Sequence, residues 1–193
     1  MVARSEESKQ AILQATLDLL GVGEGEGLTV QKLTIEAIAK RAGVSKVTIY
    51  RWWGSKAAVV LDAFVGVYLP LTEVRDDLPF VEALNDHVCA NVRQYSGPDG
   101  PVIAQLIAES QYDDDTLAEF HRRFWDDRRD AVIGLMHRGR DEGALRPDID
   151  LAIAGTLIYA PIYQHLLLRD SPLDEDSART LIGLAMEGIG AKP

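Results

Sequence analysis

Seven side chains between Ser45 and Trp52 combine chemical groups that suit contact with a nucleic acid. They include two cations, two aliphatic hydroxyls and two aromatic rings: Ser45, Lys46, Val47, Thr48, Tyr50, Arg51 and Trp52. Cations and hydroxyls bind phosphate oxygens, arginine and lysine can also read guanine edges, and a threonine methyl can meet thymine. If these side chains lie on the outer face of one helix, that helix suits the major groove of DNA.

The segment around them predicts two short helices on either side of a tight turn at residues 42–45. Thr34 can cap the first helix and Ser45 the second, and Gly43 permits the positive φ that the turn needs. Four apolar residues can meet behind the helix pair as a small core: Ile38, Val44, Ile49 and Trp53. This spacing predicts a helix-turn-helix. A plain corner of a helical bundle is the alternative.

Charge is unevenly distributed along the 193 residues, whose formal net charge is −10. Residues 1–68 carry eight basic and seven acidic side chains, and the remaining residues carry 12 basic and 23 acidic ones. A small basic region followed by an acidic body is expected when one end of a chain meets phosphate. A solvated charged face is the other reading of the same pattern.

Helical periodicity runs through nearly the whole chain and predicts an all-α protein of about nine helices. The expected helices span residues 11–20, 34–42, 45–53, 55–67, 81–92, 102–110, 113–142, 151–168 and 177–189. One cysteine gives no disulfide framework, and residues 1–10 hold no apolar signal region. Both observations are compatible with a cytoplasmic protein, which we expect here.

Several local features of the first third occur together: a helix ending at Leu20, the capped helix 34–42, the Ala-Gly-Val-Ser turn, Ile49-Tyr50 and Ser55-Lys56. In this combination the segment resembles the DNA-binding domain of TetR-type (tetracycline-repressor-like) transcriptional regulators. By this resemblance Thr34, Tyr50 and Lys56 hold phosphates. Ser45, Lys46, Val47, Thr48 and Arg51 would then face the groove. Trp52 stands where the family often has Tyr or His, so a hydrogen-bond donor survives with a different reach.

The helical remainder, with a Leu-Arg-Pro-Asp linker at 145–148 before two closing helices, is also similar to that family. The resemblance implies a three-helix DNA-binding domain over residues 1–54 and a larger ligand-binding and dimerisation domain over 55–193. It further implies a homodimer on double-stranded operator DNA, a repressor that a small-molecule effector releases. No cofactor and no membrane association are expected. The sign of regulation and the operator stay open.

Residues 151–168 contain no formal charge, which makes this helix apolar on all sides. Such a helix must be buried on all sides, so one face can pack on its own domain while the other needs a partner. We expect the dimer interface at six apolar residues: Ile158, Ile162, Leu166, Leu181, Leu184 and Ala185. A membrane span and a wholly intramolecular core are the alternatives.

A ligand site is expected among aromatic and sparse polar residues of the acidic body: Gln105, Glu109, Phe120, His121, Phe124, Trp125 and Tyr159. Apolar walls with few hydrogen-bonding groups suit an uncharged or weakly cationic, largely apolar molecule. Each of these residues could instead be ordinary core. A constitutive regulator without a ligand is therefore a second hypothesis, and a helical carrier or enzyme is a third.

Other patterns are weaker. The run from Gly21 to Gly27 lacks the Gly-Lys-Ser/Thr ending of a phosphate-binding loop, so we expect a turn there. The four histidines and Cys89 show no metal-ligand spacing, and no nucleophile motif is present. The sequence therefore predicts neither a metal site nor catalytic residues.

Overall fold

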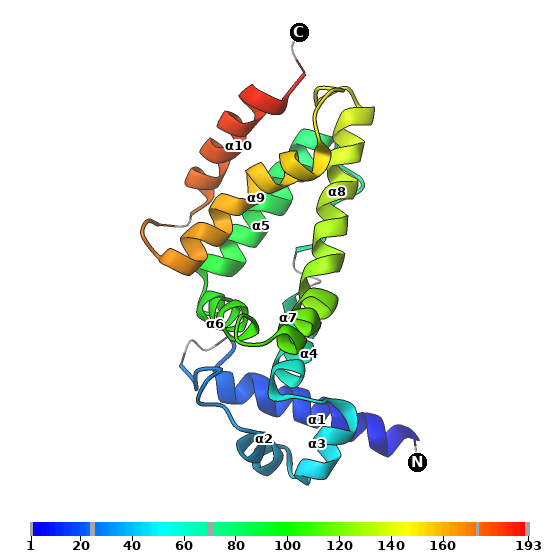
Figure 1. Cartoon of the computed structure of the whole chain (residues 1–193), viewed down its shortest axis with the longest axis vertical. Coiled ribbons are helices and arrows are strands. Elements are labelled where there is room, and N and C mark those ends of the chain that lie inside the picture. Colours follow the sequence, from blue (N-terminus) through cyan, green and yellow to red (C-terminus); the bar gives the residue numbers. More distant parts are fainter. Residues whose placement is uncertain (1, 24–25, 69–71, 173, 192–193) are drawn as a thin grey trace. The chain divides into compact units, whose positions relative to one another are not determined.

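A computed structural model describes residues 2–23, 26–68, 72–172 and 174–191 of the chain. Its elements are the helices α1 (Val2–Leu20), α2 (Ile35–Ala42), α3 (Lys46–Trp52), α4 (Lys56–Tyr68), α5 (Phe80–Ser96), α6 (Gly100–Ser110), α7 (Asp114–Phe120), the π-helical turn η2 (His121–Trp125), α8 (Asp126–Asp141), α9 (Leu151–Leu168) and α10 (Glu175–Ile189) (Figure 1). Outside these helices, the described residues pair as strands only at an isolated bridge between Leu145 and Gly190. The predicted all-α fold is confirmed.

Packing divides the chain into two compact units. The first comprises residues 1–69 and 101–125, and the second comprises residues 70–100 and 126–193. The first unit thus contains α6, α7 and η2 in addition to the predicted helix-turn-helix. The predicted boundary after residue 54 separates a DNA-binding domain from the rest of the chain by function, not by packing, and it stays a prediction.

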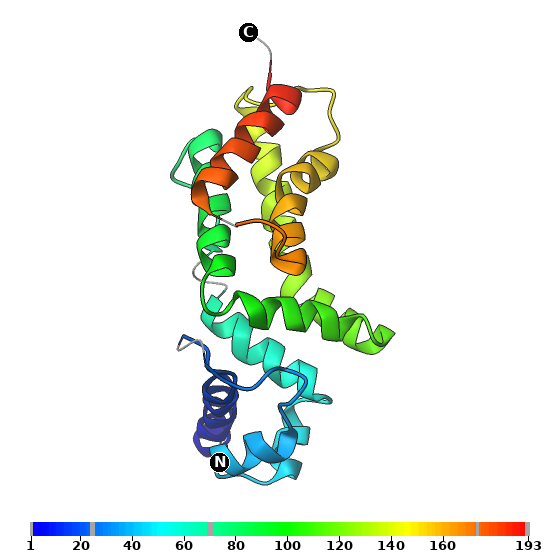
Figure 2. The ribbon, with the colours of Figure 1, turned by 90° about the vertical axis from the view of Figure 1, so that its left-hand side faces the viewer.

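In the first unit, α1 packs against α2, α3 and α4 (Figures 1 and 2). The core of this part of the unit is formed by large apolar side chains that are almost completely buried: Ile12, Leu33, Ile38, Ile49, Trp53, Leu61 and Phe64. The helix predicted to begin at Ala11 starts nine residues earlier, at Val2, and ends at Leu20 as expected. The part of the Gly21–Gly27 run at Glu24 and Gly25 lies outside the described residues.

The single long helix predicted over 113–142 is divided in the structure. Asp113 caps α7 by accepting a hydrogen bond from the Thr116 amide at 2.8 Å, but the helical pattern widens to a π-helical turn over η2 before α8 begins. A π-helical turn pairs residues five apart instead of four. Neither glycine nor proline marks residues 121–125, so the sequence gives no local signal for it.

In the second unit, α5 packs against α8, α9 and α10, and α9 also packs against α8 and α10 (Figure 2). Phe80 of α5 is completely buried. A Cβ atom added to Gly139 of α8 would lie 2.6 Å from its ring. Glycine at 139 therefore lets α5 and α8 approach closely. Leu145 and Gly190 form the isolated bridge, and the amide of Ala191 donates to the Ala144 carbonyl at 2.9 Å.

Helix α9 is, by length and composition, the described helix apolar enough to cross a bilayer, and 33% of its residues are buried in the chain. Its buried side lies in the core of the second unit. A core helix of a water-soluble protein has the same composition, so length and hydropathy alone do not indicate a membrane span.

Candidate nucleic-acid interface

The turn before the candidate recognition helix α3 is fixed by two local features. Thr34 caps α2 by accepting a hydrogen bond from the Ala37 amide at 3.1 Å. At the other end of α2, Gly43 adopts a left-handed conformation with φ 68°, and the Val44 amide then donates to the Ala39 carbonyl at 3.0 Å. These contacts end α2 and redirect the chain toward Ser45, as predicted.

Ser45 begins α3. Its hydroxyl accepts a hydrogen bond from the Thr48 amide at 3.2 Å and lies 2.9 Å from the Thr48 hydroxyl. Behind the pair of helices, three of the four predicted core residues are buried: Ile38, Ile49 and Trp53. Val44 is half-buried. Because the inner side of α3 is anchored in this way, the opposite side is left to solvent.

That outer side carries six of the predicted DNA-contacting residues in exposed positions: Ser45, Lys46, Val47, Tyr50, Arg51 and Trp52. The exposed fractions of Val47 and Tyr50 are 72% and 55%, which are high for large apolar or aromatic side chains. Thr48 is half-buried beside Ser45. Exposed cations and hydroxyls can bind phosphates and base edges, and exposed apolar groups between them can contact thymine methyls.

Two cations near this surface already have partners. The Lys46 ammonium donates to Glu36 Oε1 at 2.6 Å. This contact lowers the pKa of the Glu36 carboxyl and raises the pKa of Lys46. The Lys9 ammonium lies 5.6 Å from the centre of the Trp52 ring, a cation–π contact. Both contacts are at the surface, where such pairs contribute little and can be exchanged for contacts with phosphate.

Lys56, assigned to a phosphate by resemblance, has its ammonium directed at the protein itself. It donates to the Val30 carbonyl at 2.7 Å and lies 3.9 Å from Glu109 Oε1. The Lys56 side chain is 24% exposed. Its observed contacts therefore join the start of α4 to the loop before α2 and to α6.

The residues predicted to bind a ligand do not form one group. Gln105 accepts a hydrogen bond from the Val30 amide at 2.7 Å, and Glu109 is close to Lys56. Phe120 and Phe124 are buried with ring centres 5.2 Å apart. His121 is exposed, and Trp125 is half-buried. All six lie in the first unit, whereas Tyr159 lies in the second.

Tyr159 belongs to a polar cluster that sequence reasoning missed, which we call the buried polar cluster; three of its side chains are buried and three, including Tyr159, are half-buried. We define this cluster by six residues from α5, α8 and α9: His87, Asn91, Tyr95, Arg128, Tyr159 and Tyr163. His87 Nδ1 lies 2.5 Å from the Tyr159 hydroxyl. Arg128 donates to Asn91 Oδ1 at 2.7 Å and to the Tyr95 hydroxyl at 3.3 Å. The Tyr95 hydroxyl is 3.2 Å from that of Tyr163.

Burial sets the protonation of the buried polar cluster. It lowers the pKa of His87 to about 4, with a further contribution from the Arg128 charge. It also raises the pKa values of Tyr159 and Tyr163. The imidazole and both phenols are therefore uncharged near neutral pH. Polar residues at 87, 91 and 95, four apart within the apolar stripe of α5, are the sequence signal that could have revealed the cluster.

The predicted interface residues fall into two groups. Ile158, Ile162, Leu166 and Ala185 are buried within the second unit, Leu181 is half-buried, and Leu184 is 61% exposed. On α9 the exposed side instead carries Ile153 (68%) and Leu157 (51%), with Leu167 (45%) further along. These exposed residues are spaced as one helical face.

Within the described ranges, no group of three or more His, Cys, Asp or Glu residues is arranged to hold a metal ion. Cys89, the sole cysteine, is buried.

Two family models match the chain. Residues 30–63 match "Bacterial regulatory proteins, tetR family", and residues 74–185 match "Tetracyclin repressor-like, C-terminal domain". A curated relative is YdeS of Bacillus subtilis (strain 168), named an HTH-type (helix-turn-helix) transcriptional regulator. It is 35% identical over 97% of this chain and 92% of its own length.

Solved structures agree with these matches. The TetR family transcription regulator SCO0332 has a TM-score of 0.79 and 26% identity, with 97% of this chain and 100% of that chain covered. The regulator FadR from Bacillus subtilis, solved in complex with stearoyl-CoA, shares the fold with a TM-score of 0.71 and 17% identity over 93% of this chain and 98% of that chain. With its capped α2, its glycine turn and its exposed α3, the chain belongs to the TetR family and is a helix-turn-helix, DNA-binding transcriptional regulator.

Proposed function

We propose that the protein is a cytoplasmic repressor whose homodimer inserts two copies of α3 into successive major grooves of a near-palindromic operator. The observation that carries this proposal is the exposed outer face of α3, anchored from behind by Ile49 and Trp53. Arg51 and Lys46 are the candidates for reading bases, with Val47 and Thr48 beside them for thymine methyls. Two half-sites one helical turn apart would be separated by roughly 34 Å.

Thr34 and Tyr50 are the proposed phosphate contacts at this surface. Thr34 uses its oxygen as an acceptor in the α2 cap, so the hydroxyl hydrogen stays available for a phosphate oxygen. The start of α2 also presents amide hydrogens, which favour an anion. Lys56 contributes to this surface chiefly by holding the loop before α2 through the Val30 carbonyl.

Dimerisation is proposed along the exposed face of α9, with Ile153, Leu157 and Leu167, together with Leu184 of α10. These side chains replace Ile158, Ile162 and Leu166 of the sequence-based proposal, because those three are already covered by their own chain. Burying exposed apolar area is the main favourable term in most protein associations. The apolar face of α9 is long enough for such an interface.

The proposed effector binds in the second unit at the buried polar cluster, and we infer that it is a largely apolar molecule with one hydrogen-bonding group. Two observations support this placement. The polar atoms of His87, Asn91 and Tyr159 lie among apolar helices, and both side-chain amide atoms of Gln94 are buried without a hydrogen-bond partner among the described residues. A pocket with apolar walls and a few polar groups is typical of small-molecule sites.

Binding to DNA from the region upstream of its own gene tests the regulatory proposal. Fluorescence anisotropy with that duplex and with a shuffled duplex of equal length should give tighter binding to the natural sequence. Equal affinities for both duplexes would contradict sequence-specific binding there. A thermal-shift screen of amphipathic small molecules, repeated with Gln94→Leu, tests the effector site, because a true effector should stabilise the natural chain more than the variant.

A further inference from the structure

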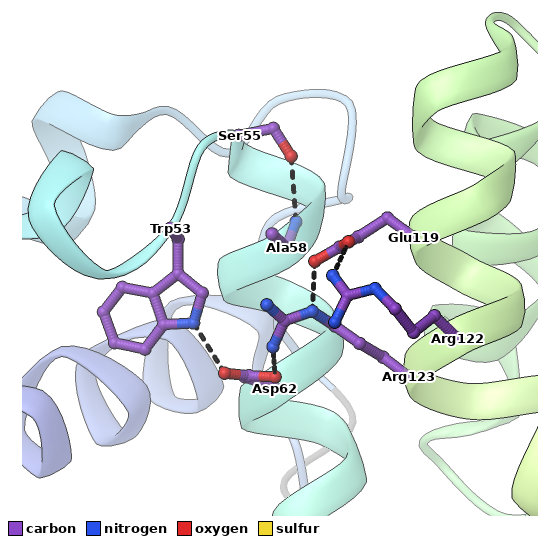
Figure 3. A network of polar contacts seen from close by, with 7 residues as sticks. All are labelled: Trp53, Ser55, Ala58, Asp62, Glu119, Arg122 and Arg123. Carbon is purple, nitrogen blue, oxygen red and sulfur yellow. Dashed lines mark hydrogen bonds and ion pairs between the residues drawn. The ribbon is translucent and has the colours of Figure 1, made fainter.

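Asp62 of α4 connects the end of the recognition helix to the π-helical turn η2 (Figure 3). Its Oδ2 atom accepts a hydrogen bond from the indole N–H of Trp53 at 2.7 Å. Its Oδ1 atom is ion-paired with the guanidinium of Arg123. The side chains of Asp62 and Arg123 are 25% and 22% exposed, so these contacts are partly shielded from water. One carboxylate thus holds two elements at once.

Trp53 is the residue that ends α3. Its backbone amide donates to the Ile49 carbonyl at 3.1 Å, and its side chain is 2% exposed. A buried ring attached to the last turn of a short helix moves only when that turn moves, because interiors are close-packed. The hydrogen bond to Asp62 therefore fixes the direction of the C-terminal end of α3.

Arg123 is held in place from its own side by Glu119 of α7, which accepts from the Arg123 Nε atom. Burial alone would lower the pKa of Arg123. The hydrogen bonds to Asp62 and Glu119 together outweigh this effect, so the pKa is raised above its ordinary value. The neighbouring Arg122 also pairs with Glu119, but in Figure 3 it is not joined to Asp62. Its side chain is 63% exposed. Arg122 is therefore a natural control for Arg123.

Arg123 also lies in an unusual element of secondary structure. It lies in η2, the π-helical turn that interrupts an otherwise α-helical pattern, and such turns occur frequently at functional sites. The turn also closes the first unit, because the next residue along the chain, Asp126, belongs to the second unit. A change in the pitch of η2 would change the position of the Arg123 guanidinium.

We propose that Asp62 is a positioning residue for the recognition helix, and that Arg123 in the π-helical turn controls it. While Arg123 occupies Oδ1, the carboxylate cannot rotate, and Oδ2 holds the Trp53 indole. When η2 rearranges and withdraws Arg123, the carboxylate is free to turn toward water, and the C-terminal end of α3 loses its anchor. This inference rests on the proposed function, in which α3 enters the major groove.

The expected consequence is a loss of sequence-specific binding with little change in general affinity for DNA. Base readout depends on the direction of α3, whereas attraction to the DNA backbone depends mainly on how many lysine and arginine side chains lie near phosphates. The test uses Arg123→Gln and Trp53→Phe, with Arg122→Gln as the matched control that removes the same charge one residue away. Dissociation constants are measured by anisotropy for a duplex selected by the natural protein from a random pool and for an unselected duplex.

Arg123→Gln and Trp53→Phe should each reduce the ratio of specific to non-specific affinity by about 2- to 30-fold, the range of a network mutation. The double variant should reduce the ratio no further than the more damaging single variant, because both changes break one chain of contacts. Arg122→Gln should keep the ratio of the natural protein. An unchanged ratio in Arg123→Gln, or equal reductions in the Arg122 and Arg123 variants, would overturn the inference.

A spectroscopic measurement separates this inference from the proposed function. In protein labelled with ¹⁵N at the indole nitrogens, the Trp53 signal is assigned by its absence in Trp53→Phe. Arg123→Gln should shift this signal and speed its hydrogen exchange, whereas Arg122→Gln should do neither. If no duplex is selected, the proposed function fails while this result still decides the link to Asp62. An unshifted Trp53 signal in Arg123→Gln would refute that link even when DNA binds.

Discussion

The ammonium of Lys56 and the carbonyl of Val30 are 2.7 Å apart, so a lysine that family resemblance assigns to DNA is used inside the protein. The same ammonium lies 3.9 Å from Glu109 of α6. A lysine used in this way supports the helix-turn-helix from behind. We therefore propose that its effect on DNA binding is indirect, through the loop that presents Thr34 and α2.

Replacement of Lys56 by Met should separate these two roles. We expect a lower melting temperature and a weaker operator complex. If the Lys56 ammonium keeps its contact with the Val30 carbonyl on DNA and neutralises no phosphate, the salt dependence of the dissociation constant should stay almost unchanged. Arg51→Met serves as the comparison. If Arg51 binds one phosphate in each protomer of the proposed homodimer, its replacement should reduce the magnitude of the slope of log K against log salt by about 1.8, because two contacts of about 0.9 each are lost. An equally large change of the slope for Lys56→Met would contradict this expectation and show that Lys56 binds a phosphate.

The pKa of His87 predicts how stability responds to acid. Its folded-state pKa is about 4, below the ordinary value of 6.5, so between these values the unfolded chain binds more protons than the folded chain. The free energy of unfolding should therefore fall as pH decreases from about 6.5 to 4, with up to about 3 kcal/mol from this residue. Well above pH 6.5, where the histidine is uncharged in both the folded and the unfolded chain, the residue contributes no pH dependence.

Denaturant unfolding at several pH values measures this contribution. His87→Gln should lose distinctly less stability between pH 6.5 and 4 than the natural chain. His137→Gln changes an exposed histidine and should follow the natural curve. Parallel curves for the natural chain and His87→Gln would show that His87 is not held neutral by the fold.

Two glycines of α8 give a matched test of packing in the second unit. A Cβ atom at Gly139 would lie 2.6 Å from the ring of Phe80, whereas at Gly134 nothing lies within 4 Å. Gly139→Ala should therefore destabilise the protein by about 1–3 kcal/mol. Gly134→Ala should stabilise it by about 0.5–1 kcal/mol, because alanine favours the helix. Thermal and denaturant unfolding would measure both, and equal effects would refute the close approach of α5 and α8.

The oligomeric state should depend on the exposed face of α9. Leu157→Asp and Leu184→Asp each place a charge at an exposed apolar position and should yield folded monomers in sedimentation velocity. Tyr112→Asp, at a residue 83% exposed in the first unit, should leave the dimer intact. Ile158→Asp should instead unfold the chain, because it buries a charge. A stable dimer in both leucine variants would place the interface elsewhere.

The helix-turn-helix could be predicted from the sequence because its determinants are local. Thr34 and Ser45 mark the starts of their helices, and Gly43 marks the turn, each through contacts within a few residues. The family was predicted from the same residues and is confirmed. The helix over 151–168 was also predicted with its observed bounds.

Features that depend on distant residues could not be predicted in this way. Arg123 and Asp62 form an ion pair although they are 61 positions apart in the sequence. No local pattern predicts that pair or the π-helical turn that contains Arg123. A helix apolar on all sides does not reveal which side its own chain covers. For that reason the sequence predicts Ile158, Ile162 and Leu166 at the dimer interface, whereas Ile153 and Leu157 are the exposed residues of this helix.

Selection of binding sites from a random pool of DNA duplexes tests most directly that the outer face of α3 reads sequence. The natural protein should enrich a near-palindromic site. Lys46→Ala or Arg51→Ala should relax the preference at individual positions, by about 1–3 kcal/mol for each bidentate pair of hydrogen bonds that the variant removes. The preference at the other positions should persist. The account would be contradicted if the natural protein enriched no sequence, or if both variants enriched the same site with unaltered preference at every position.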